Sequence, residues 1–110
     1  MSYQHKDLAA GRWSELPFLE QMANIASEVG RALKWKAKNN DVYCKQAYER
    51  ALELIDLTLD SAKGFPCLKE VARMREALVD FFIGSNQFNS TEESWQAYLS
   101  SFTFAARRKH

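Results

Sequence analysis

The chain has 110 residues, 46% of them hydrophobic, and its formal net charge is only +1. This balance excludes an intrinsically disordered chain, and it supplies no overall electrostatic attraction toward nucleic acid or a membrane. Four glycines and two prolines are few for the many turns of a β-sandwich or barrel. Long helices joined by short loops are therefore expected.

Residues 1–13 are predicted to be a leader that packs on the helices through Tyr3, Leu8 and Trp13. This segment has no apolar stretch typical of a signal peptide, and no apolar run in the chain is long enough to span a membrane. The sequence therefore predicts a cytoplasmic protein that makes no membrane contact.

Apolar residues recur at helical spacing in four segments, which predicts four amphipathic helices over residues of about 15–38, 41–62, 66–83 and 91–108. The short connections between them favour antiparallel neighbours. The expected fold is a single all-α domain, an antiparallel four-helix bundle with up-down-up-down order.

Local signals predict where three of these helices begin. Ser14 can cap the first helix, with Pro17 in its first turn, and Asp41 can cap the second. Ser90 followed by Glu93 has the spacing of a capping box for the last helix.

The only two histidines, His5 and His110, lie near the two ends of the chain. A di-iron bundle and a histidine-dependent helical nuclease both need an imidazole among their site residues, so neither is expected. No general base accompanies the serine and threonine hydroxyls. We expect no enzymatic activity and no cofactor.

Carboxylates nevertheless form a stripe along the second predicted helix, and two more lie four residues apart on the third. Such groups on facing helices can hold Mg²⁺, as all-helical nucleotide pyrophosphatases do. Only Glu53 and Asp56 match the paired spacing of those enzymes, so a solvated face is favoured over a Mg²⁺-dependent nucleotide hydrolase. The residues concerned are Glu49, Glu53, Asp56, Asp60, Glu76 and Asp80.

The first helix carries a strip of small side chains beside its apolar face. Glycine in mid-helix costs about 1 kcal/mol relative to alanine, so a close helix approach is expected to offset it. The contact is either internal or between subunits. The strip, a candidate for self-association, comprises Ala23, Ala26, Ser27 and Gly30.

Basic residues and one tryptophan suggest two further contacts. Trp35 lies between Lys34 and Lys36, either as a cap over the end of the bundle or as an exposed anchor for a partner. Six basic residues are expected to share one end of the bundle, either as an ordinary solvated surface or as a patch that binds phosphates. They are Lys63, Lys69, Arg73, Arg107, Arg108 and Lys109.

Three strings, His5–Trp13, Gln21–Ile25 and Ala105–Arg108, together resemble a family of short uncharacterised helical proteins of bacteria and archaea. That family has no established activity, so the resemblance implies no site residue.

The leading hypothesis is a non-enzymatic helical module that associates with itself or with another protein. A nucleic-acid-binding accessory protein that uses the basic end is the alternative. No small-molecule substrate is inferred.

Overall fold

The computed structural model describes residues 11–61 and 64–108, and within them the chain is all-helical, with five helices and no strand. The all-α prediction is therefore confirmed for this part of the chain. None of these helices is both long enough and apolar enough to cross a membrane. The helices are α1 (Trp13–Glu15), α2 (Phe18–Ala37), α3 (Asp41–Asp60), α4 (Phe65–Phe82) and α5 (Glu92–Arg108).

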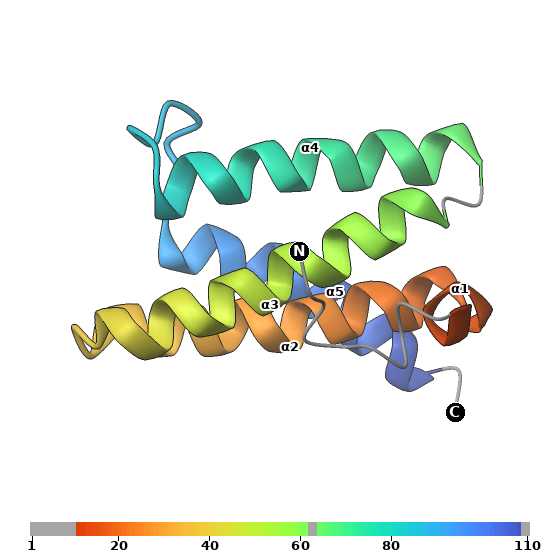
Figure 1. The fold of residues 1–110 in the computed structure, drawn as a ribbon, viewed down its shortest axis with the longest axis horizontal. Helices are drawn as coiled ribbons and strands as arrows, with labels where there is room; N and C mark the ends of the chain where they lie inside the picture. Colours follow the sequence, from red (N-terminus) through yellow and green to blue (C-terminus); the bar gives the residue numbers. More distant parts are fainter. Residues whose placement is uncertain (1–10, 62–63, 109–110) are drawn as a thin grey trace.

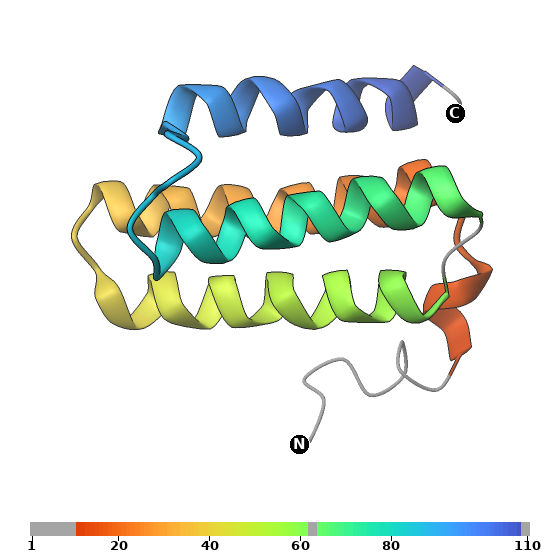
Figure 2. The same cartoon turned by 90° about the horizontal axis from the view of Figure 1, so that it is seen from above.

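The four long helices lie lengthwise beside one another, and the single turn of α1 lies at one end of them (Figures 1 and 2). α2 packs against both α3 and α5, and α3 also packs against α4, whereas α4 and α5 approach each other less closely. The start of α4 and the end of α5 lie at the end of the molecule that carries α1 (Figure 1). We call this the α1 end, and the opposite end, where α2 turns into α3, the turn end.

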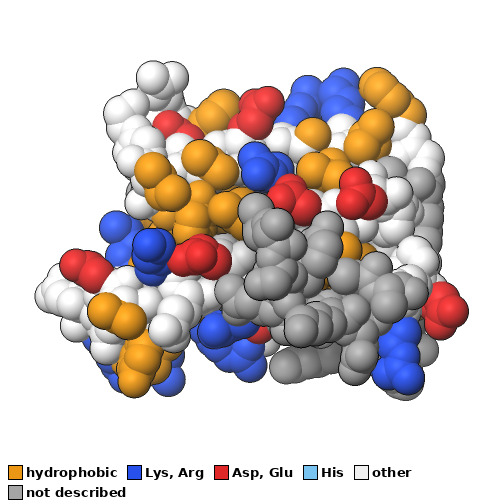
Figure 3. Space-filling model, in the orientation of Figure 1, with side chains coloured by type: hydrophobic (Ala, Val, Ile, Leu, Met, Phe, Trp, Pro, Cys, Tyr) orange, Lys and Arg blue, Asp and Glu red, His pale blue; other side chains and the backbone are white. Residues whose placement is uncertain are grey.

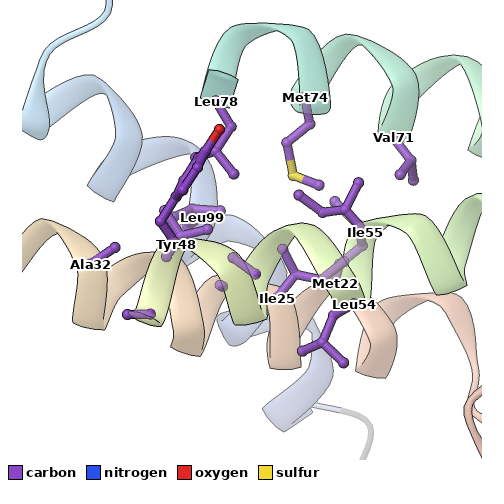
Figure 4. Close-up of a cluster of buried hydrophobic side chains, with 14 of the residues drawn as sticks. Met22, Ile25, Ala32, Tyr48, Leu54, Ile55, Val71, Met74, Leu78 and Leu99 are labelled. Atoms are coloured by element: carbon purple, nitrogen blue, oxygen red, sulfur yellow. The ribbon is translucent and has the colours of Figure 1, made fainter. Parts of the chain in front are cut away.

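The core is built from one face of each long helix (Figure 4). Met22 and Ile25 of α2, Ile55 of α3 and Leu78 of α4 are fully enclosed, and Leu99 of α5 is buried against the same cluster. Burying a side chain of this size contributes about 1.5–3 kcal/mol. Only three side chains of α4 are buried, fewer than on α2 or α3.

α2 begins at Phe18, so the predicted start near residue 15 is wrong. Leu16 and Pro17 have extended backbone, with ψ of 141° and 151°. Proline disfavours helical conformation in the residue before it, which separates α1 from α2 and places Pro17 at the N-cap. The hydroxyl of Ser14 donates to the carbonyl of Gly11 instead of capping α2.

The predicted caps of the second and fourth long helices are each displaced by one residue. Asn40, not Asp41, caps α3, because its side-chain oxygen accepts a hydrogen bond from the Tyr43 N–H at 3.1 Å. The capping box of α5 is formed by Thr91 and Ser94, whose hydroxyls and N–H groups bond reciprocally. Ser90 is unsuitable because Asn86 binds both its N–H and its carbonyl in the preceding loop. The other predicted ends lie within two residues of the observed ones.

The last residue of the predicted leader, Trp13, is buried in the core at 2% exposure. Its indole Nε1–H donates to Thr58 on α3 at 2.8 Å, and its carbonyl accepts from the Gln21 side chain at 3.0 Å. The other predicted contacts of the leader, through Tyr3 and Leu8, lie outside the described residues.

Candidate interaction surfaces

The carboxylates of the acidic stripe do not converge on a metal site. Asp56 pairs with Arg75 of α4 at 2.9 Å, while Glu49, Asp60 and Glu76 are exposed. Among residues 11–61 and 64–108, no group of three His, Cys, Asp or Glu side chains is placed to hold a metal ion. The arrangement gives no support to a Mg²⁺-dependent hydrolase.

Asp80, the last residue of that acidic set, binds backbone N–H groups of the loop that follows α4. Its two carboxylate oxygens accept hydrogen bonds from the N–H groups of Gln87 and Phe88, at 2.8 and 3.0 Å. This contact closes the loop between α4 and α5. Glycine suits position 84 in this loop, because a Cβ there would approach the Asp80 backbone to 3.1 Å, which is a tight contact.

The small-residue strip on α2 is divided between the core and the surface. Ala26 is buried and Ala23 is half-buried, whereas Ser27 and Gly30 are exposed. A Cβ built at Gly30 would meet no atom within 4 Å. No described helix therefore comes close enough to Gly30 to require a glycine there. That the strip forms a contact between subunits stays a prediction.

Trp35 lies at the turn end and is half-buried. Its ring packs edge-on against Tyr43, with centroids 4.9 Å apart, and the Lys38 ammonium lies 5.3 Å from the ring centroid. These contacts fit the interpretation of Trp35 as a cover over the α2–α3 turn. Tyr43, at 48% exposure, lies further into solvent.

Of the six basic residues predicted to share one end, only Lys69 and Arg73 have described side chains, and both are exposed. Lys63 and Lys109 lie outside the described residues. Arg107 and Arg108 end α5, whose C-terminus lies at the α1 end together with the start of α4 (Figure 1). Asp60, also exposed at the end of α3, brings an opposing charge to the same region.

One buried carboxylate with two arginine partners was not anticipated from the sequence. Glu28 on α2 is 8% exposed and accepts from Arg31 at 2.9 Å and from Arg50 of α3 at 3.1 Å. The spacing of three residues between Glu28 and Arg31 was the only available signal, and such spacing is common on solvated helices.

The most exposed apolar surface lies on α4, and sequence reasoning missed it. Phe65 and Ile83 are 71% and 70% exposed, and Leu68 between them is 39% exposed. Ala72 and Val79 lie half-buried along the same side of the helix. We call these five residues the α4 stripe. Figure 3 shows apolar side chains along α4 on this face of the molecule.

The α4 stripe continues at the turn end into a hollow between α3 and α4, visible in Figure 3. The hollow has a volume of about 390 Å³, and Tyr48, Phe82, Ile83 and Cys44 supply its apolar lining. Burial raises the pKa of the Cys44 thiol, Lys36 opposes that shift, and Asp41 adds to it. The thiol is therefore protonated at neutral pH and is a poor nucleophile.

Comparison with protein-family models, with curated proteins and with solved structures found no match. The resemblance to short uncharacterised helical proteins therefore stays a prediction.

Proposed function

We propose that this protein is a non-enzymatic helical interaction module that associates with itself. The observation that carries the proposal is the α4 stripe, in which Phe65 and Leu68 at the start of α4 and Ile83, the residue after its last turn, are exposed. Single exposed apolar residues are ordinary, but several of them joined by half-buried apolar side chains on one side of a helix are typical of an interaction surface.

The proposed scaffold is an antiparallel four-helix bundle. The reversal of direction between successive long helices supports it (Figures 1 and 2). A rigid bundle can present a helix face without rearrangement, which lowers the cost of association. The cytoplasmic location predicted from the sequence is part of the same proposal.

The proposal of a non-enzymatic role rests on how reactive groups are placed. Burial keeps the Cys44 thiol protonated by raising its pKa, Asp56 is paired with Arg75, and Asp80 binds the backbone of a loop. Each of these groups therefore has a structural explanation that requires no substrate.

Light scattering at increasing protein concentration tests self-association. We expect a mass above that of the 12.7 kDa chain, and Phe65→Ser should reduce it because the substitution removes apolar area from the α4 stripe. Val42→Ser is the matched control, since Val42 is similarly exposed but lies on α3. A strict monomer at high micromolar concentration would contradict the proposal.

The small-residue strip on α2 provides a second variant for the same measurement. Ser27→Glu introduces a charge into the exposed part of the strip. If this variant, and not Phe65→Ser, abolished association, the contact would lie on α2 rather than on α4.

Nucleic-acid binding is the second candidate, favoured by the exposure of Lys69 and Arg73 in the first half of α4, the helix that begins at the end of the molecule where α5 ends. A mobility shift with short RNA or DNA should weaken as salt rises, because phosphate contacts release counterions. Truncation after Ala106 should weaken it further. A shift that is insensitive to both changes would exclude the basic end as the binding site.

A further inference from the structure

We propose that the partner of the α4 stripe is a second copy of this chain, whose own α4 lies antiparallel to the first. This inference rests on the proposed function and adds to it the contact surface, the orientation and the register. Two properties of α4 carry it, namely the spacing of its exposed apolar residues and the division of charge between its two halves.

Four of the five members of the α4 stripe, all but Ile83, share with Arg75 the spacing of helices that pair along their length. Phe65, Leu68, Ala72, Arg75 and Val79 follow one another in steps of three, four, three and four residues. This is the heptad spacing that keeps one seam of a helix facing a partner helix. The seam lies on the outer side of α4, because Val71, Met74 and Leu78 carry the side that is buried in the core.

Arg75 is the one charged member of this series, and its charge is already compensated. Its Nε lies 2.9 Å from a carboxylate oxygen of Asp56 on α3. In an antiparallel pair that places Leu68 opposite Val79 of the second copy, Arg75 lies opposite the small side chain of Ala72. A large residue therefore meets a small one, and the seam can close.

The charged residues beside the seam determine the relative orientation of the two α4 helices. Lys69 and Glu76 lie one heptad apart on the flank of the seam, both are exposed, and neither forms an ion pair within residues 11–61 and 64–108. In the antiparallel register described above, Lys69 of each copy lies beside Glu76 of the other, because flanking positions of the same type meet across an antiparallel pair. In a parallel pair, flanking positions of unlike type meet instead, so Lys69 and Glu76 would lie on opposite sides of the seam and would form no pair with each other.

In a two-fold pair of this kind each copy uses the same surface and contributes the same two charges. The contact is therefore used up when two copies have paired, and no further copy can add to it. The proposed assembly is therefore a dimer rather than an open filament. Phe65 and Ile83, the two most exposed members of the α4 stripe, lie at opposite ends of the contact.

Charge-reversal variants test both the partner and the orientation. In a dimer of Lys69→Glu, or of Glu76→Lys, both flanking pairs become like-charged. We expect sedimentation equilibrium at low salt to show dimerisation weakened about tenfold in each case. An equimolar mixture of the two variants should recover dimerisation, because the mixed dimer again has two opposite-charge pairs. The double variant K69E/E76K should also recover it.

Lys34→Glu and Glu93→Lys are the matched controls, since they make the same charge changes at exposed sites on α2 and α5. We expect both to dimerise as the unmodified chain does, and circular dichroism should show that all variants stay helical. Unchanged dimerisation of both single α4 variants, or failure of the mixture to recover, would overturn the antiparallel contact while leaving self-association in place. A monomeric unmodified chain would overturn both.

Discussion

At the scale of single residues, Thr58 joins the short helix α1 to the core. Its hydroxyl accepts a hydrogen bond from Trp13 Nε1–H and donates one to the carbonyl of Leu54, each at 2.8 Å. Thr58 and Trp13 are each 2% exposed. Water therefore cannot replace either bond, and the indole depends on this one acceptor.

Replacing Thr58 with valine should lower the free energy of unfolding by about 1–3 kcal/mol, because the shape is kept while the buried indole N–H loses its partner. Urea denaturation followed by tryptophan fluorescence measures the change. Thr58→Ser retains the hydroxyl and should cost less than valine. Equal stability of the valine variant and the unmodified chain would show that the indole finds another acceptor.

At the scale of elements, α4 explains why sequence reasoning missed the exposed surface. Leu68, Ala72 and Val79 recur at helical spacing together with Val71 and Leu78, and this pattern predicts one shared apolar face. In the structure, Val71 and Leu78 face the core, whereas the other three lie on the outer side. Helical spacing identifies apolar residues on a helix, but two adjacent apolar faces look like one broad face until the neighbouring helices are in place.

The loop between α4 and α5 depends on one carboxylate. Asp80→Ala removes the acceptor of the Gln87 and Phe88 N–H groups, so we expect the free energy of unfolding to fall by about 1.5–3 kcal/mol. Chemical denaturation measures this loss, and limited proteolysis should cut the loop faster. Glu49→Ala, at an exposed site on α3, is the control and should change neither. A loop equally resistant in both variants would contradict this role for Asp80.

At the scale of the whole molecule, an open hollow of about 240 Å³ lies between α4 and α5, lined in part by Glu70, Met74, Trp95 and Tyr98. Burial raises the pKa of Tyr98 well above its usual range, and the charge of Glu70 and its hydrogen bond to the phenol add to the shift. The folded protein therefore holds this proton at a pH where the unfolded chain has released it.

The sign of the pH dependence follows from this difference. Above about pH 10, the unfolded state binds fewer protons than the folded state, so the free energy of unfolding falls as pH rises. Urea midpoints measured from about pH 9 to about pH 11 should show this fall, and Tyr98→Phe should reduce its slope. An identical slope in the variant would exclude Tyr98 as a source of the dependence.

The sequence by itself determined the elements. Apolar residues at helical spacing predict four long helices whose ends, apart from the start of α2, lie within two residues of those observed. These signals suffice because a helix is stabilised by groups a few residues apart, which are all present in the local sequence. The absence of histidine between His5 and His110 is likewise a property of the sequence alone.

Only the tertiary structure decided which apolar face of α4 is buried, that Glu28 is enclosed with Arg50, and that Asp56 and Asp80 have separate partners on different parts of the fold. Each of these outcomes depends on residues brought together from different helices or across a loop. Helical spacing determines which residues share a face of their own helix, but it does not determine what that face meets.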